Sequence, residues 1–169
     1  MTDSALRPMM EADLERVLAW RNDPEVRRFM YTSHEITPEE HRRWFERVNS
    51  QPGVNLLIYE AAGTPQGFMN IHMTQCPRVA DWGFYLAPEA PRGTGMALGE
   101  AALDYAFTQL NFHKVCGQAL GFNERSIRFH EKLGFRRDGV LREQHYDGRV
   151  YQDVICFGIL ATEWRNGNG

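Results

Sequence analysis

A glycine-rich turn, residues 92–97 (RGTGMA), stands between a predicted strand, residues 81–86, and an alanine- and leucine-rich segment, residues 96–110, that predicts a helix. The N-terminus of a helix offers unpaired N–H groups and the positive end of the helix dipole, and glycines let an anion approach the backbone closely. The turn therefore predicts a sheet protein with interposed helices. Taken alone, it favours a pyrophosphate site and an ordinary glycine turn about equally.

Two nucleotide-binding motifs with similar turns do not fit. In the dinucleotide fingerprint G-x-G-x-x-G the last glycine comes three residues after the second, whereas here Gly99 follows Gly95 by four. The preceding strand is not the first of a βαβ unit, and no acidic residue follows at the distance expected for a ribose ligand. A Walker loop would carry a lysine directly after the glycines, which this turn lacks.

Short apolar runs and helical segments alternate along the whole chain. Thr37 and Pro38 with acidic residues behind them form a strong helix start, Gly134 is a good helix stop, and Asp147-Gly148 is a strong hairpin signal. The resulting order predicts a mixed α/β or α+β protein. Strands are expected at 6–9, 55–60, 67–73, 81–86, 114–119, 140–146 and 149–159, with a loop at 62–66, and helices near 11–22, 37–48, 96–110 and 123–133.

The chain has 169 residues, 43% hydrophobic and 24% charged, which suits one domain, expected at residues 1–165, and a disordered tail at 166–169. Its net charge of -3 argues against nucleic acid or an anionic membrane as partner. No signal peptide or membrane-spanning stretch is recognisable, so a cytoplasmic location is expected. A homodimer is left open.

Three cysteines, Cys76, Cys116 and Cys156, are an odd number without a C-x-x-C pair. This pattern argues against a disulfide framework and against a zinc site. We expect all three to be small buried hydrophobic residues rather than reactive thiols.

Two motifs together resemble the GNAT superfamily of N-acetyltransferases. Arg92-x-x-Gly95-x-Ala97 resembles its acetyl-CoA signature, Q/R-x-x-G-x-G/A. Residues 123–135 (NERSIRFHEKLGF) resemble its second motif, in which Asn is followed by a small residue, Tyr, Glu, Lys, Gly and Phe. The element order matches from Leu6 to about Trp164. The resemblance implies the GNAT fold: a mixed, mostly antiparallel central sheet with two splayed parallel strands, flanked by about four helices.

The same resemblance implies acetyl-CoA as co-substrate and no metal. Its pantetheine would lie between the splayed strands 81–86 and 114–119, and a neutral amine would attack the thioester directly. A backbone N–H near Leu86 would stabilise the tetrahedral oxyanion. The residues implied in cofactor binding are Leu86, Arg92, Gly93, Thr94, Gly95, Met96, Ala97, Asn123 and Ser126.

His130 occupies the place where the family motif has tyrosine. The tyrosine protonates the departing CoA thiolate, so His130 is the candidate catalytic residue. With a reference pKa of about 6.5, only a minority of histidine is charged at neutral pH. The alternative, that His130 only packs on the helix face and forms hydrogen bonds, stays open. Candidates for the general base, by residue type only, are Glu35, His72, Asp81 and Glu143.

The N-terminal third is expected to supply the acceptor pocket. Its motifs resemble the pseudaminic-acid pathway branch of the superfamily, which acetylates the 4-amino group of a UDP-linked 4-amino-4,6-dideoxy sugar. A diphosphate would suit cationic side chains, and the sugar methyl group an apolar wall. The implied substrate-binding residues are Arg21, Met30, Tyr31, His41, Trp44 and Tyr85. Trp20 and Trp44, at helical positions, are more often core residues, and a solvated face explains the neighbouring arginines equally well.

Two other functions stay open. The helix-rich start also resembles GNAT enzymes that acetylate polyamines or ribosomal-protein N-termini, and Glu35, Glu39 and Glu40 could supply carboxylates to a polyamine. A non-catalytic acyl-CoA sensor is the third alternative. It would require that His130 cannot donate a proton.

Overall fold

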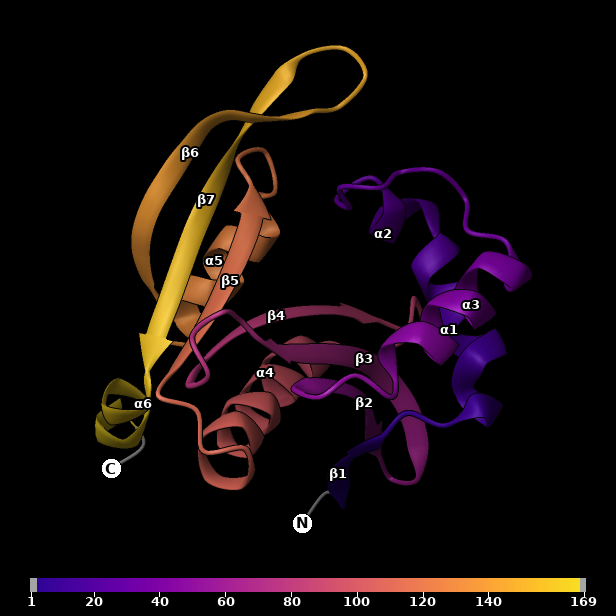
Figure 1. Ribbon diagram of the computed structural model, residues 1–169, viewed down its shortest axis with the longest axis horizontal. Coiled ribbons are helices and arrows are strands. Elements are labelled where there is room, and N and C mark those ends of the chain that lie inside the picture. The colour runs from indigo at the N-terminus through magenta and orange to yellow at the C-terminus, as the bar shows by residue number, and fades with distance from the viewer. Residues whose placement is uncertain (1–2, 168–169) are drawn as a thin grey trace. The chain divides into compact units, whose positions relative to one another are not determined.

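The computed structural model describes residues 3–167, which cluster into two compact units (Figure 1). The first contains the described residues up to His72 together with Gly83–Ala102, and the second contains Met73–Trp82 together with Leu103 and the described residues after it. The seven strands follow the order β1-β2-β3-β4-β5-β7-β6, in which β4 and β5 run parallel. The mixed sheet with a parallel pair is the expected GNAT fold.

The first unit begins with antiparallel strands β1 (Ser4–Pro8), β2 (Val54–Ala61) and β3 (Thr64–Met73). A two-residue turn joins β2 to β3, with φ of 50° at Ala62 and 73° at Gly63. Two successive positive φ angles match the twist of a hairpin. The expected loop over residues 62–66 was too long, because residues 64–66 already belong to β3.

Helices η1 (Glu11–Asp13), α1 (Leu14–Asn22), α2 (Pro24–Arg27) and α3 (Pro38–Val48) lie between β1 and β2 in the chain. The predicted start of α3 is confirmed. The Thr37 hydroxyl accepts a hydrogen bond from the Glu40 N–H at 3.2 Å, and the Glu40 carboxylate accepts one from the Thr37 N–H at 2.7 Å. This reciprocal capping box satisfies two N–H groups of the helix end.

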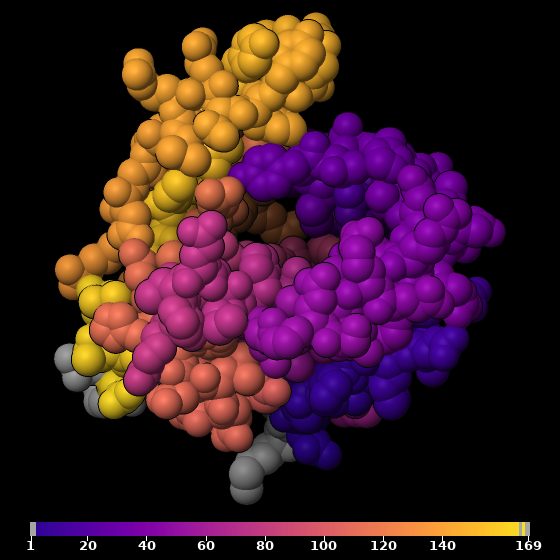
Figure 2. Space-filling model, in the orientation of Figure 1, coloured from indigo at the N-terminus to yellow at the C-terminus, as the bar shows by residue number. Residues whose placement is uncertain are grey.

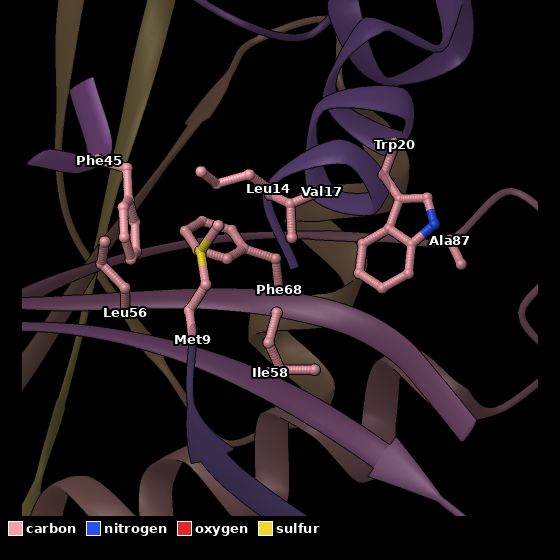
Figure 3. Packing of buried hydrophobic residues seen from close by; sticks show 9 residues of the cluster. All are labelled: Met9, Leu14, Val17, Trp20, Phe45, Leu56, Ile58, Phe68 and Ala87. Carbon is pink, nitrogen blue, oxygen red and sulfur yellow. The ribbon is translucent and has the colours of Figure 1, made fainter. Parts of the chain in front are cut away.

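The core of the first unit is an apolar cluster seen in Figure 3. Helix α1 contributes three side chains and α3 contributes Phe45, which pack against residues of β2 and β3. Trp20 is buried here, so it is a core residue. The members are Met9, Leu14, Val17, Trp20, Phe45, Leu56, Ile58, Phe68 and Ala87.

Asp13, which is 2% exposed, ties η1 to β1 through an ion pair with Arg7. Two Arg7 nitrogens donate to its carboxylate at 2.7 and 2.9 Å, and the Met10 N–H donates at 2.8 Å. These hydrogen bonds, chiefly those from Arg7, lower the pKa of Asp13 below its usual value despite its burial.

We expect Asp13→Ala to reduce the free energy of unfolding by about 2 kcal/mol, because Arg7 and the Met10 N–H lose their acceptor. A carboxylate with a lowered folded-state pKa stabilises the fold above its unfolded pKa, about 3.9, and this contribution is lost as the pH falls through the folded-state value. Urea denaturation should therefore show the difference at pH 7 and a smaller one in acid. Glu11→Ala, which breaks an exposed pair with Arg42, is the control and should change stability little.

The second unit contains the first residues of β4 (Val79–Leu86), the strands β5 (Lys114–Leu120), β6 (Arg136–Tyr146) and β7 (Tyr151–Leu160), and helix α5 (Glu124–Lys132). The parallel β4–β5 ladder has three residue pairs, from Val79↔Lys114 to Asp81↔Cys116. Strand β5 pairs antiparallel with β7 along the full length of β5, from Lys114↔Leu160 to Leu120↔Val154. The predicted stop of α5 is confirmed by Gly134, whose φ is 92°.

Strands β6 and β7 form the hairpin that Asp147-Gly148 predicts, with its end at the surface (Figure 2). The Asp147 carboxylate accepts hydrogen bonds from the N–H groups of Arg149 and Val150, both at 2.9 Å. These bonds, together with one from Gln152, lower the pKa of Asp147 to about 2. The carboxylate of Asp147 therefore organises the loop through its charge.

Several details differ from the expectations. The helix predicted over 96–110 is α4 (Thr94–Asp104) followed by a π-helix, η2 (Tyr105–Gln109). Helix α2 and the C-terminal helix α6 (Ala161–Gly167) were not expected. The predicted tail overlaps the end of α6, and its last two residues lie outside the described residues. Cys76 is exposed, so the expectation that it is buried was wrong; Cys116 and Cys156 are partly buried.

Candidate functional site

The glycine turn leads into α4 as expected. Gly93 has a φ of 96°, a conformation that favours glycine, and Thr94 begins the helix. The Thr94 hydroxyl donates to the Pro91 carbonyl at 2.7 Å, and its N–H bonds the same oxygen at 3.1 Å. Thr94 thus closes the turn internally. The N–H groups of Gly95 and Met96, in the first helical turn, have no carbonyl four residues back within the helix and can face an anion.

Leu86, whose N–H the sequence analysis expects to stabilise the oxyanion, is the last residue of strand β4. The next residue, Ala87, donates its N–H to the Gln66 carbonyl of β3 at 2.9 Å. Because successive N–H groups of a strand point to opposite edges, the Leu86 N–H points away from β3. The β4–β5 ladder ends five residues earlier, at Asp81.

Asn123 and Ser126 form the start of α5. The Asn123 side-chain oxygen accepts a hydrogen bond from the Ser126 N–H at 3.1 Å, so Asn123 is the N-cap. The Ser126 carbonyl in turn lies 2.8 Å from His130 Nδ1. The Asn and Ser of the second motif therefore cap and order the first turn of α5.

His130 lies inside the second unit, only 2% exposed. Its Nε2 accepts a hydrogen bond from the Trp82 indole N–H at 3.0 Å. Its ring stacks on Phe157 of β7, with centroids 4.8 Å apart and planes 6° from parallel. Burial lowers the pKa of His130, while the hydrogen bond to Ser126 acts in the opposite direction.

Gly117 provides the space for this hydrogen bond. A Cβ atom at Gly117 would lie 2.5 Å from His130 Nε2 and 2.7 Å from Trp82 Nε1. Neither Trp82 nor Gly117 was predicted to matter. They lie 48 and 13 positions from His130 in the sequence, and no local pattern links the three.

Arg21, Arg27 and His41 lie near one another in the first unit, two guanidinium groups beside an imidazole. Arg21 donates from Nη2 to the Thr32 carbonyl at 2.6 Å, but Arg21 Nη1, Arg27 Nε and His41 Nε2 are buried without a hydrogen-bond partner. Burial lowers the pKa of Arg21, the Tyr85 hydroxyl raises it, and the Arg27 charge lowers it. Burial also lowers the pKa of His41, a hydrogen bond to the Leu14 backbone raises it, and the Arg21 charge lowers it. Among residues 3–167, no carboxylate contributes to the pKa shift of either group.

Aromatic rings line up beside this cluster. The His41 and Trp44 rings stack with centroids 5.2 Å apart, Trp44 meets Phe68 at 6.0 Å, and Phe68 meets Tyr85 at 4.9 Å. Burial raises the pKa of Tyr85 well above its usual range, so its hydroxyl stays protonated. The structure thus brings Arg21, His41, Trp44 and Tyr85, four of the predicted substrate-binding residues, close to one another.

The segment after α2 is anchored to the last turn of α1. The Asn22 amide donates to the Ile36 carbonyl and accepts from the Ile36 N–H, both at 2.8 Å, and Arg21 holds Thr32. Tyr31, in the segment that these bonds anchor, is 54% exposed. Asn22, whose side chain forms both hydrogen bonds to Ile36, was not among the predicted residues.

A pocket of about 530 Å³ opens between α1 and residues 35–38. It carries two carboxylates, Glu15 and Glu35, above apolar side chains of α1 and Ile36. Glu35 is the one candidate base that lines it. Elsewhere, Glu143 has a φ of 48° at an irregularity of β6, where its N–H donates to Asp153.

Within residues 3–167, no group of three His, Cys, Asp or Glu side chains is placed to hold a metal ion. No helix in this part of the chain is long and apolar enough to cross a membrane.

A parallel strand pair that ends early, a glycine turn at a helix N-terminus and a following Asn-capped helix are the features of an acyl-CoA-dependent transferase. A family model described as an acetyltransferase (GNAT) domain matches residues 5–136, more than half of the chain. The chain therefore belongs to the GNAT family of acetyltransferases. It is an acetyltransferase, with acetyl-CoA as its co-substrate.

The chain is similar to acetyltransferases that carry different names. The chain is 32% identical to an uncharacterized N-acetyltransferase, YokL, of Bacillus subtilis over 87% of this chain and 85% of that protein. It is 25% identical to a spermidine N(1)-acetyltransferase of Vibrio cholerae over 95% of both chains. It is 24% identical to the acetyltransferase PseH of Campylobacter jejuni over 73% of this chain and 76% of that protein.

Among solved structures, the spermidine N-acetyltransferase of Vibrio cholerae in complex with CoA and spermine has a TM-score of 0.89 at 24% identity. The match covers 96% of this chain and 98% of that one. At this identity the likeness establishes the shared fold.

Proposed function

We propose that this acetyltransferase acts on an amine that carries an anionic group, specifically the 4-amino group of a UDP-linked 4-amino-4,6-dideoxy sugar. The observation that carries the proposal is the pair of Arg21 and Arg27 beside His41: Arg21 Nη1 and Arg27 Nε are buried donors without an acceptor. A buried N–H without an acceptor costs about 1–3 kcal/mol. The oxygen atoms of a diphosphate would supply the missing acceptors and charge.

Charge also separates this acceptor from a polyamine. Arginine pairs well with phosphate, whereas a spermidine ammonium beside Arg21 would meet a like charge at low dielectric. The aromatic rings of Trp44, Phe68 and Tyr85 offer the apolar wall that a sugar methyl group would need. The similarity to PseH over three quarters of the chain agrees with the proposal.

In the proposed reaction the turn at Gly95 binds the pyrophosphate of acetyl-CoA, and the Leu86 N–H stabilises the oxyanion. The cytoplasm, where acetyl-CoA and nucleotide sugars are made, is the proposed location.

A polyamine acceptor is the second candidate. The pocket between α1 and residues 35–38 favours it, because Glu15 and Glu35 would attract ammonium groups. The similarity to a spermidine N(1)-acetyltransferase over 95% of both chains favours it too.

Release of free CoA thiol from acetyl-CoA would distinguish these acceptors. The panel contains a UDP-4-amino-4,6-dideoxy sugar, the same sugar without UDP, spermidine, and a peptide with a free N-terminus. We expect the highest kcat/KM with the UDP sugar and a clear loss without UDP. A higher kcat/KM for spermidine would favour the polyamine function.

Arg21→Gln is expected to raise the KM for the UDP sugar by about 10- to 100-fold, because a charged hydrogen bond to phosphate is lost. The KM for acetyl-CoA should stay nearly constant. Arg42→Gln is the matched control: Arg42 lies on α3 with its side chain 56% exposed and pairs only with Glu11 in the described contacts, so both KM values should stay unchanged. An equal rise of both KM values in Arg21→Gln would contradict the assigned role.

A further inference from the structure

The two partners of His130 determine which ring nitrogen carries its proton. The Ser126 carbonyl can only accept a hydrogen bond, so His130 Nδ1, 2.8 Å away, must donate. The Trp82 indole N–H can only donate, so His130 Nε2, 3.0 Å away, must accept. His130 is therefore the neutral Nδ1–H tautomer, with its one lone pair occupied by Trp82.

We propose that Trp82 withdraws His130 from proton transfer and that the pair instead acts as a positioning element. A donor at this place in the motif would need a proton on Nε2. That proton would face the indole N–H, so the bond to Trp82 would have to break and leave two buried donors without acceptors. The proposal rests on the acetyltransferase activity of the chain and is independent of the acceptor.

The position of the Trp82–His130 pair in the fold indicates which elements it holds together. Trp82 follows Asp81 and Gly117 follows Cys116, the last residue pair of the parallel β4–β5 ladder. The Trp82–His130 hydrogen bond crosses this point, and the missing side chain of Gly117 makes room for it. The pair therefore ties α5 to β4 at the point where the ladder ends.

The surroundings of the ring favour its neutral form. The aromatic side chains that face it include Trp82 from β4, Phe157 from β7, and Phe129 and Phe135 from α5 and the residues after it, and none of these four titrates. A charge on His130 would have to be buried among aromatic rings. The hydrogen-bond geometry and the burial of the ring thus both indicate that His130 is neutral.

The reaction balances without a proton from His130. The neutral amine attacks the thioester carbon, the C–N bond forms, and the C–S bond breaks with its electron pair on sulfur. The former amine proton passes to solvent water, and the CoA thiolate takes its proton from solvent.

Paired variants separate a positioning role from proton donation. His130→Phe leaves the Trp82 N–H without its acceptor, Trp82→Phe leaves His130 Nε2 without its donor, and the double variant removes both groups while keeping rings at both places. We expect each single variant to lower kcat/KM for acetyl-CoA, because a buried partner is stranded. The double variant loses the tie but strands no partner, so it should lower kcat/KM no further than the single variants and keep kcat within about tenfold of the wild-type value. If His130 donates the proton, the double variant should instead lose about 100-fold in kcat, as His130→Phe alone would.

A measurement on the wild-type protein covers the case in which a variant does not fold. Long-range ¹H–¹⁵N correlation spectra of His130 should show the Nδ1–H tautomer between pH 6 and 8, with and without CoA, and the kcat profile of the wild type should have no falling limb near the histidine pKa. A protonated Nε2 in the CoA complex, or a falling limb that disappears in His130→Phe, would overturn the proposal.

Discussion

Replacement of Gly117 by alanine is expected to reduce the free energy of unfolding by about 3 kcal/mol, because the new methyl group would displace two locked ring systems. It would lie 2.5 Å from His130 Nε2 and 2.7 Å from Trp82 Nε1. Both rings are buried among other aromatic side chains and cannot move aside. Thermal and urea denaturation would measure the loss.

Gly158→Ala is a control with a similar initial clash. Its Cβ atom would meet Asp138 Oδ2 and, at 2.5 Å, Lys114 Cε. These atoms are the ends of side chains that are 43% and 29% exposed, and they can rotate into solvent. We expect a loss well below that of Gly117→Ala. Equal losses would mean that the buried rings yield as easily as surface side chains.

Gly95→Val is expected to weaken CoA binding by roughly tenfold or more, because the branched side chain would enter the space of the pyrophosphate in the first turn of α4. Valine is no worse than glycine inside a helix, so the variant should remain folded. Calorimetric titration with CoA, with circular dichroism on the same sample, would separate binding from folding.

Arg92→Ala provides the comparison for the glycine. If the backbone N–H groups carry the interaction, removing the Arg92 side chain should cost less CoA affinity than Gly95→Val. A folded Gly95→Val protein with wild-type affinity would show that the pyrophosphate binds elsewhere.

Local signals in the sequence predicted much of the fold, because they depend on residues a few positions apart. The Thr37–Glu40 capping box, the stop at Gly134 and the turn at Asp147 are each determined within four residues. Helix α6 and the π-helix after α4 depend on packing with distant segments, and their own residues carry no clear start or stop signal. The predicted loop after β2 was too long. Proline is typical of loops, but Pro65 lies in β3 and pairs with Glu60.

The candidate site was predicted less completely, for a similar reason. The motifs point to the residues at the glycine turn and to His130, but the partner of His130 comes from another strand. The balance of acidic and basic residues in the sequence also cannot distinguish one arginine of the first helices from another. In the structure Arg28 pairs with Glu25 at the surface, whereas Arg27 Nε is buried without a partner. Only the fold distinguishes a solvated arginine from one with a buried nitrogen that lacks a partner.

Arg21 and Asn22, at the end of α1, anchor the segment that joins α2 to α3 at two points. One part of this segment should tolerate insertions and the other should not. Arg21 holds Thr32 and Asn22 holds Ile36, so residues 33–35 bridge two pinned points only four positions apart. Extra residues there would pull one anchor loose. Extra residues between α2 and Thr32 would only lengthen a closed loop, at a cost that grows slowly with its length. Chains of this type can therefore vary in length around Met30 while Ile36 and the start of α3 keep their place, which makes that stretch suitable for loop grafting.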